Sequence, residues 1–441
     1  MDKASPIKKS AVFIVLGLAL RLILMPVTLH ADMVFVHYFP SYLSGRGVWD
    51  IYGYFGSRFT EMFGLSYYPP LTYYLTAFFQ FLLKPVNPDL IAWLNGFHEA
   101  SVAGAQEGVV HFLSGLPVSK TLWIIFWMKF PYLVAEIACF AAVFNFFKSP
   151  DEKKRLTALW LLNPVLIFSS YVFGQYRIFP FLFMSLSALM LSRDRKGLSG
   201  IFYGFACLMD NYAVLLFLFM FFISGEKTRQ KIRWASGVIF TVVAVLVPLY
   251  FSSGGQVLNA YFSPHLLRTA VARGIFNHHL AIVNPICKII FLGSYGWIFF
   301  RLATKKKNPD KACQSDLFIY VPASLLFILY ATMITSVHYL MWCFPFLFII
   351  QVRGEPWRPF WTWCLTGLLF LFNLDGRSLN MGLFAPLNPV YFSSLPSLHE
   401  LMSHFLPWGK VIVLARFIFS GICLYFAAAL WKARIEPALK A

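Results

Sequence analysis

Long apolar stretches, separated by short basic ones, follow one another along almost the whole chain. The first covers residues 11–28, and one of the longest covers residues 121–147. A helix crosses the bilayer with roughly 20 apolar residues. It also satisfies every backbone polar group internally, whereas lipid offers these groups no partner. The pattern therefore predicts an all-α polytopic membrane protein.

Further apolar stretches complete the predicted set of membrane segments. They cover residues 71–83, 156–175, 176–191, 234–250, 279–300, 316–335, 339–350, 360–374 and 411–430. Residues 84–120 are more polar and form either an interfacial segment or one poor span. Together the stretches predict about 11–13 transmembrane or re-entrant helices in a single domain, residues 1–441.

Basic residues between the apolar stretches indicate the side of the membrane on which each loop lies. Lys3, Lys8 and Lys9 precede the first stretch, and residues 148–155 and 193–196 form further basic clusters. Cytoplasmic loops carry an excess of Lys and Arg, so we expect the N-terminus in the cytoplasm. Residues 29–70 then form a large first extracytoplasmic loop, with aromatic helices on the membrane surface.

Residues 197–224 have the length of one span, but basic clusters flank both ends. Two cytoplasmic flanks require an even number of crossings, so we predict two half-length helices that meet near Asp210 and Asn211. Membrane proteins tolerate a broken helix only where it faces protein or a wet cavity. Asp210 is therefore expected to line a cavity.

The composition supports the membrane class and excludes a soluble enzyme. Of the 441 residues, 59% are hydrophobic and only 13% are charged, far outside the usage of soluble domains. The net charge of +18 comes from the clusters between apolar runs, so it indicates membrane orientation rather than nucleic-acid binding. The seven cysteines show neither metal-site nor disulfide-framework spacing.

Ionisable residues that membrane orientation does not require collect on the predicted outer side. Asp32 lies at the outer end of the first helix, and His338 lies at an outer turn. The second outer loop adds His265, Arg268, Arg273, His278 and His279. This arrangement suits a reaction between an acceptor hydroxyl and an anionic lipid. The carboxylate accepts the hydroxyl proton while Arg and His donors stabilise a leaving phosphate.

Several short motifs resemble, in their order, those of a known superfamily. They are the loop-start Asp32, Tyr-Tyr-Pro-Pro-Leu at 67–71, Lys-Phe-Pro-Tyr-Leu-Val-Ala-Glu at 129–136, Leu-Asn-Pro at 162–164, Gly-Gln at 174–175 and His-Tyr with a later Pro at 338–345. Over roughly residues 10–350, the chain resembles the GT-C superfamily of polyprenyl-phosphate-sugar-dependent glycosyltransferases. It is most similar to the mannosyltransferases of glycosyltransferase family 87. Residues 351–441 would add C-terminal helices and an outer loop.

The resemblance implies an integral, inverting transferase without a cofactor or an obligatory metal. The residues it implies for the site are Asp32 as catalytic base, Arg268, Arg273, His279 and His338 at the donor phosphate, and Tyr68, Gln175, Arg177 and Asp210 along the substrate cavity. The expected partners are a polyprenyl-phosphate sugar donor, a lipid-linked or glycan acceptor and membrane lipids, with no nucleic acid.

The chain departs from the family pattern at three positions. Many relatives carry an acidic pair in the first outer loop, whereas Met33 follows Asp32 here, so a metal held by such a pair is not expected. Relatives often have Asp where this chain has Arg177, and Lys where it has Asp210. We therefore predict a charge-swapped pair, in which Arg177 and Asp210 meet and support the cavity wall rather than catalyse.

Simpler structural explanations stay open for several residues. Asp32 could be a helix-end residue in a solvated loop, with Asp50 as the reserve base. Glu61 is expected to be a loop charge. Arg268 and Arg273 could anchor their loop to anionic lipid headgroups.

Four further polar residues also admit a structural role. His279 could simply open the next helix at the interface, and His338 could be a satisfied core histidine. Lys129 and Glu136 lie seven residues apart, on nearly one helix face, and we expect both to be structural.

The predicted function is transfer of a sugar, mannose by resemblance, from polyprenyl phosphate to an acceptor on the outer face of a bacterial inner membrane. Two other classes stay open. A transporter or lipid flippase would use Asp210, Lys129 and Glu136 as a substrate or proton pathway, although such proteins commonly show paired repeats and we see none. A noncatalytic subunit of an envelope complex would tolerate substitution of Asp32.

Overall fold

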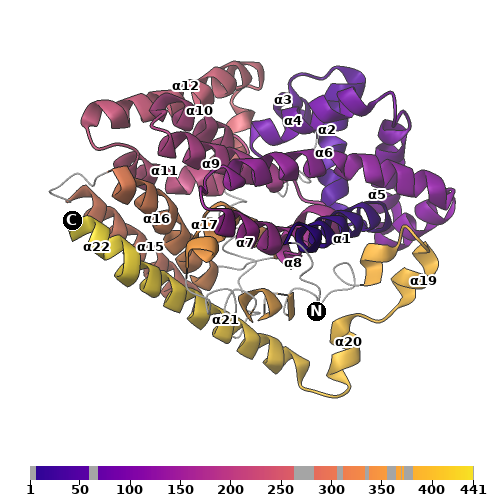
Figure 1. Ribbon diagram of the computed structural model, residues 1–441. Helices are drawn as coiled ribbons and strands as arrows, with labels where there is room; N and C mark the ends of the chain where they lie inside the picture. Colours follow the sequence, from indigo (N-terminus) through magenta and orange to yellow (C-terminus); the bar gives the residue numbers. More distant parts are fainter. Residues whose placement is uncertain are drawn as a thin grey trace.

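The computed structural model describes residues 6–58, 68–262, 283–304, 311–332, 337–354, 364–368, 370–371 and 381–440. Helices are the only regular elements among these residues. The predicted all-α class is therefore confirmed. In Figure 1, α10 and α12 lie at the upper left and α2 to α5 at the upper right, with α6 running between them.

The first two helices meet at a sharp bend. α1 (Pro6–Val27) and α2 (Ala31–Arg46) are inclined at 73° to each other. α2 ends at Gly47, whose left-handed φ of 67° lets its N–H bond the carbonyls of Leu43 and Tyr42. A short helix, α3 (Ile51–Arg58), follows. Because most of α2 is buried and packs on α4 and α5, it is an internal helix, where the sequence predicted one on the membrane surface.

Three helices follow the first loop. They are α4 (Pro70–Leu83), α5 (Leu90–Ser114) and α6 (Val118–Phe144). For residues 84–120, the sequence left two alternatives open, an interfacial segment or one poor span. The structure has two helical segments there, both within α5, and the chain turns back between them at Gly104 and Ala105, where Ala105 adopts a φ of 47°. The second segment packs on the first, because the ring of Phe112 lies 6.0 Å from that of Trp93 and 6.3 Å from that of Phe97.

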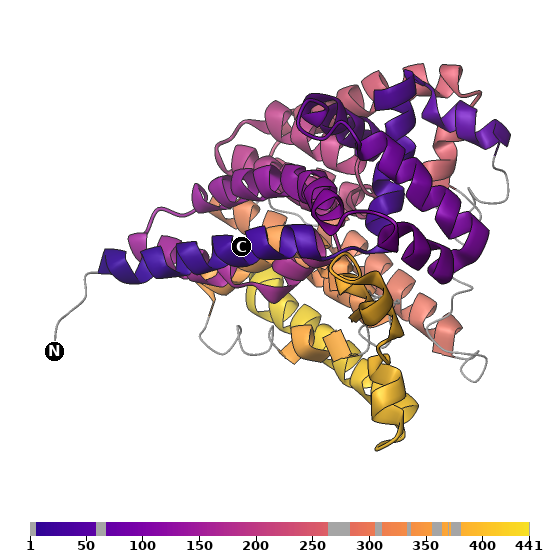
Figure 2. The ribbon, with the colours of Figure 1, turned by 90° about the vertical axis from the view of Figure 1, so that its right-hand side faces the viewer.

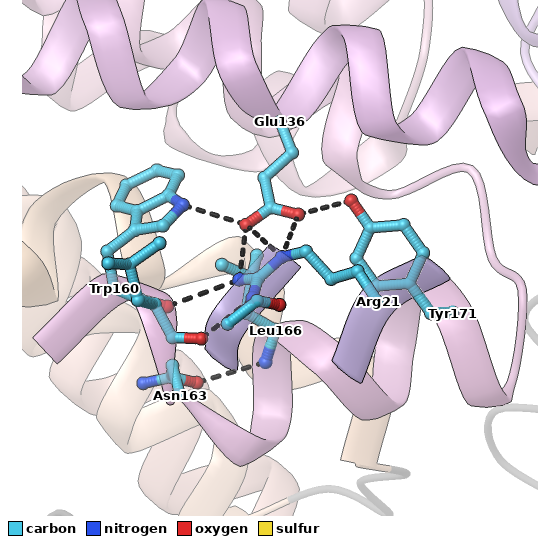
Figure 3. Close-up of polar contacts among 8 residues, drawn as sticks. Arg21, Glu136, Trp160, Asn163, Leu166 and Tyr171 are labelled. Atoms are coloured by element: carbon cyan, nitrogen blue, oxygen red, sulfur yellow. Dashed lines mark hydrogen bonds and ion pairs between the residues drawn. The ribbon is translucent and has the colours of Figure 1, made fainter. Parts of the chain in front are cut away.

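The stretch predicted as a span over residues 156–175 is broken. α7 (Pro150–Leu161) is followed by α8 (Pro164–Ile167) and a π-helix, η2 (Phe168–Val172), at a bend of 47°. Pro164 suits the first turn of the new helix, and the Asn163 side chain accepts a hydrogen bond from the Leu166 N–H at 3.0 Å (Figure 3). α9 (Ile178–Ser192) completes the hairpin.

The predicted break near Asp210 is confirmed. α10 (Lys196–Cys207) and α11 (Asn211–Ile223) are separate helices, and Asp210 between them has extended backbone angles. α12 (Thr228–Ser252) then packs along α10.

The C-terminal part adds further helices. They are η3 (Gln256–Leu258), α13 (Asn259–Phe262), α15 (Val283–Ala303), α16 (Lys311–Thr332), η5 (Val337–Trp342), α17 (Phe344–Arg353), η7 (Met381–Phe384), α19 (Pro389–Ser394), α20 (Leu398–Ser403), α21 (Trp408–Leu430), η8 (Trp431–Ile435) and α22 (Glu436–Lys440). α21 packs against α16 and, with α22, forms the long diagonal edge of Figure 1.

Several helices are long and apolar enough to cross a membrane. Three described segments meet this test alone: Val118–Phe144, Thr228–Ser252 and Trp408–Leu439. Counting each bent pair, α1 with α2 and α7 with η2, as one span gives five. Shorter apolar helices are Ile178–Ser192, Asn211–Ile223, Asp316–Thr332 and Phe344–Arg353. The N-terminal half of α1 projects from the body in Figure 2 and exposes a run of apolar side chains, as a lipid-facing helix does.

Buried apolar side chains gather in two large clusters. The first cluster is built mainly by α6, α9, α10, α11, α16, α17 and α21. The second cluster is rich in aromatic rings and comes from α2, α3, α5 and part of α6. α2 belongs to both, because Val36 lies in the first cluster and Met33 and Val34 in the second.

Candidate active site

Asp32 is the second residue of α2 and lies beside the bend between α1 and α2. Its backbone N–H donates to Nδ1 of His30 at 3.1 Å, which caps the helix. A carboxylate in the first turn also suits the positive end of the helix dipole. The Asp32 side chain is 47% exposed, so a substrate can reach it, unlike the buried residues around it.

Gln175 lies against Asp32 although the two are 143 residues apart in sequence. Its Nε2 donates a long hydrogen bond of 3.4 Å to Oδ2 of Asp32. The Gln175 side chain is buried, and its Oε1 atom has no hydrogen-bond partner among the described residues. The structure thus brings together two predicted site residues.

Gly174 allows this contact. It has a φ of 73°, and a Cβ atom at this position would lie 2.4 Å from Sδ of Met33. Both the left-handed backbone and the close approach exclude a larger residue. The Gly-Gln motif therefore packs its backbone directly onto the residue that follows Asp32.

Arg177 and Asp210 form a buried ion pair, which confirms the predicted contact. Trp342 Nε1 donates to the same oxygen of Asp210, Oδ2, at 3.0 Å. The guanidinium lies 4.3 Å from the ring centroid of Tyr339 and 4.9 Å from that of Trp342, within cation–π range. Arg177 Nε has no hydrogen-bond partner among the described residues. One donor of the pair is therefore left for another group.

Tyr68 lies between Asp32 and the ion pair. Its ring meets that of Tyr176 edge to face, with 5.1 Å between centroids. Burial first, and then the negative charge of Asp32, raise the pKa of the Tyr68 hydroxyl well above its usual value, while Arg177 opposes them. The hydroxyl is therefore neutral and lies within the electrostatic field of both groups.

His338 completes an aromatic stack at the site. Phe173 stacks on His30 with 3.9 Å between centroids and lies 4.6 Å from the ring of His338. Burial lowers the pKa of His338 well below its usual 6.5. Its imidazole is therefore neutral, and Nδ1 has no hydrogen-bond partner among the described residues. His338 can take part in a hydrogen bond, but it does not supply the positive charge expected of a phosphate ligand.

Three predicted phosphate ligands lie outside the described residues. They are Arg268, Arg273 and His279. Their assignment stays a prediction. Within the described ranges, no group of three or more His, Cys, Asp or Glu side chains is placed to hold a metal ion.

A second buried polar network lies behind the site (Figure 3). Arg21 Nε donates to both carboxylate oxygens of Glu136, at 3.0 and 2.9 Å, and Trp160 Nε1 donates to Oε1 at 2.8 Å. Tyr171 donates its hydroxyl to the same carboxylate. The sequence reasoning named Glu136 but missed Arg21 as its partner. The available signal was an arginine inside an apolar run, since such charges are costly unless paired.

These helices and buried charges define an all-α membrane protein with polar networks buried in an apolar interior. Residues 108–306 match the model of glycosyltransferase family 87. Over these residues the chain is similar to glycosyltransferase family 87, and the protein is a membrane glycosyltransferase, which acts on a sugar donor and an acceptor. The matched range contains Gln175, Arg177 and Asp210 but not Asp32. No curated protein matches the chain significantly.

Proposed function

We propose that the protein transfers a hexose, mannose, from polyprenyl phosphate to an acceptor hydroxyl, with inversion and with Asp32 as the general base. The observation that carries the proposal is the half-exposed carboxylate of Asp32, which accepts a hydrogen bond from the buried Gln175 at 3.4 Å. A base needs access to the acceptor and a fixed orientation, and this pair provides both.

The proposed reaction is a single displacement at C1 of the sugar. The acceptor oxygen attacks C1, the bond from C1 to the phosphate oxygen breaks, and polyprenyl phosphate leaves with the bonding electrons. The acceptor proton passes to Asp32 as the new bond forms. In this scheme Gln175 holds Oδ2, and the acceptor hydroxyl approaches Oδ1.

The leaving phosphate needs positive charge or hydrogen-bond donors. Arg268, Arg273 and His279 supply these in the proposal, and neutral His338 adds a single hydrogen bond. Arg177 is neutralised by Asp210. We assign this pair to shaping the site.

The proposed location is the extracytoplasmic side of a bacterial inner membrane. The support is the distribution of basic clusters, which assigns residues 148–155 and 193–196 to the cytoplasm. Asp32 follows the first apolar helix, whose start carries Lys8 and Lys9. The acceptor, lipid-linked or glycan, then meets the donor outside.

The deciding experiment is transfer from synthetic polyprenyl-phosphate mannose by the purified protein. Asp32→Asn keeps the side-chain size and removes the base, so kcat should fall by about 100- to 10,000-fold. Asp50→Asn is the matched control. Asp50 accepts a hydrogen bond from the Gly53 N–H and so caps the start of α3. The activity of this variant should stay near that of the wild type.

The outcomes separate the parts of the proposal. Full activity of Asp32→Asn would contradict the assigned base, and loss of activity in Asp50→Asn alone would move the base to Asp50. Transfer from a polyprenyl-phosphate glucose but not from the mannose donor would correct the sugar and leave the base in place. The family match favours a transferase over the transporter or flippase considered from sequence.

A further inference from the structure

Lys129 is a fully buried lysine on α6 whose ammonium group binds three oxygens. Nζ donates to the carbonyl of Thr28 at 2.5 Å, to the hydroxyl of Thr28 at 2.8 Å and to the carbonyl of Tyr171 at 2.6 Å. An ammonium group has three N–H donors, which match these three oxygens in number. The buried amino group is therefore fully hydrogen-bonded, as it must be in an apolar interior.

Both carbonyls that Lys129 binds lie at the ends of helices. Thr28 directly follows α1, which ends at Val27, and Tyr171 lies in the last turn of η2. The last carbonyls of a helix have no partner within it and carry the negative end of its dipole. The Thr28 hydroxyl also lies 2.7 Å from the Tyr171 carbonyl and donates to it. Lys129 thus binds two helix ends from different parts of the chain that also contact each other.

The two helix ends lead directly into the candidate site. Asp32 follows Thr28 by four residues, and Gln175 follows Tyr171 by four residues. Asp32 and Gln175 are also the pair that meet at 3.4 Å. Lys129 therefore binds both segments, the one that carries the proposed base and the one that carries its hydrogen-bond donor. It binds each of them four residues before the site residue.

Two residues of α6 bind Tyr171, one at its backbone carbonyl and one at its hydroxyl. Lys129 binds its backbone carbonyl, and Glu136, on the same face of α6, accepts its hydroxyl hydrogen bond (Figure 3). Arg21 from α1 then binds Glu136, with Nη2 at 2.6 Å from Oε1. The spacing of Lys129 and Glu136 along α6 thus lets Lys129 bind the backbone carbonyl of Tyr171 and Glu136 bind its hydroxyl.

We propose that Lys129 is a positioning residue for glycosyl transfer, which acts by fixing Asp32 against Gln175 rather than by touching substrate. This inference rests on the proposed role of Asp32 as the base. A displacement of reacting groups by about 1 Å can reduce the rate of an enzyme by about 100-fold. Loss of the ammonium group should therefore lower kcat, while the KM values for donor and acceptor stay unchanged.

The main test is Lys129→Met, which keeps the chain length and removes the charge. Its kcat should fall by about 100-fold. Combining it with Gln175→Ala should lower kcat little further than the stronger single variant, because both act on the same orientation of Asp32. Lys196→Met is the matched control, a buried lysine beside Asp194 in the turn between α9 and α10, and it should keep its activity.

Hydrogen exchange measured by mass spectrometry gives a readout that does not depend on activity. In Lys129→Met, peptides that cover residues 28–35 and 170–177 should exchange at least about tenfold faster, whereas peptides from α10 and α12 keep their wild-type rate. If Lys129→Met does not fold, Thr28→Val replaces it. That variant removes one of the three acceptors of Lys129 and also the hydrogen bond from the Thr28 hydroxyl to the Tyr171 carbonyl, and it should increase exchange in the same two peptides.

The possible results distinguish this inference from the proposed function. Wild-type exchange in both peptides, or a wild-type kcat in folded Lys129→Met, would overturn the positioning role. Faster exchange together with a fully active Asp32→Asn would leave the connection at Lys129 intact and reject Asp32 as the base. A KM increase with unchanged kcat would also overturn the inference, because it would indicate substrate binding by Lys129.

Discussion

The guanidinium of Arg177 and the carboxylate of Asp210 illustrate how single residues set the chemistry of this interior. Alone, either charge would be strongly unfavourable where it is buried, and together they also receive a hydrogen bond from Trp342 and the ring faces of Tyr339 and Trp342. Asp210 therefore neutralises the charge of Arg177 inside the protein. Arg177 cannot attract a donor phosphate as an unpaired arginine would.

Removing one member of this pair should destabilise the protein more than removing both. Arg177→Met or Asp210→Leu alone leaves a buried uncompensated charge, and each should lower the unfolding free energy by about 3–5 kcal/mol. The double variant should lose less than the sum of the two. Thermal unfolding in detergent measures this, and strictly additive losses would show that the two side chains do not depend on each other.

His338 predicts a pH dependence of stability. Burial lowers its pKa in the folded protein, so below about pH 6.5 the unfolded chain binds a proton that the folded chain excludes. Stability should then fall as the pH drops, by up to about 1.4 kcal/mol per pH unit for this group. His338→Gln should remove that part of the slope.

The measurement is the melting temperature of the wild type and the variant between about pH 5 and 7. His404→Gln, at the exposed end of α20, is the control and should keep the wild-type slope. Equal slopes for wild type and His338→Gln would show that His338 is protonated equally in both states.

At the scale of elements, the network around Glu136 ties three helices together. Arg21 from α1 binds Glu136 of α6 and also the carbonyls of Trp160 and Leu161, where α7 ends. The last carbonyls of a helix lack their usual partners within it, and the Trp160 carbonyl here accepts a 3.3 Å backbone bond from Asn163 beside that of Arg21. The arginine thus stabilises the break in the predicted span.

Glu136→Gln tests this connection. It leaves the charge of Arg21 without a carboxylate, so the unfolding free energy should fall by about 3–5 kcal/mol. Asp89→Asn is the matched control, since Asp89 pairs with Lys120 at 2.8 Å on the surface and an exposed pair contributes only about 0–1 kcal/mol. Equal losses in the two variants would contradict a structural role for the buried network.

The elements also show what could be predicted from sequence. The break at Asp210 followed from charge counting, because basic flanks on both sides require an even number of crossings. The break at Asn163 was missed, although Asn-Pro is a helix-start signal, because the surrounding apolar run is long enough for a span. The partner of Glu136 was also missed, since a contact between residues 21 and 136 depends on packing that no local pattern encodes.

At the scale of the molecule, the basic clusters predict an orientation that labelling can check. Trp49, 74% exposed beyond α2, is predicted to lie outside, and Lys154 in α7 is predicted to lie in the cytoplasm. A membrane-impermeant maleimide should label Trp49→Cys in intact cells, and Lys154→Cys only after permeabilisation. The unsubstituted parent protein gives the background, and the reverse pattern would contradict the orientation and the proposed outer site.

The membrane class could be predicted from composition alone, because no soluble core hides so much apolar surface. The candidate site was harder to predict from the sequence. Asp32 and Gln175 came from motifs whose order resembled a family, whereas Asp210 came from charge counting. The structure brings Asp32 against Gln175 and Arg177 against Asp210. The neutral state of His338 depends on its burial in the folded protein, which could not be predicted from the sequence.

The membership of α2 in both apolar clusters has a consequence for turnover. Val36 packs with the cluster that includes α9, which begins just after Gln175 and Arg177, whereas Met33 and Val34 pack with the aromatic cluster around α3 and α5. Both clusters therefore hold the first part of α2, and Asp32 with it. A substitution that loosens either cluster, even far from the site, should thus reach the separation of Asp32 and Gln175 and with it the rate of proton transfer.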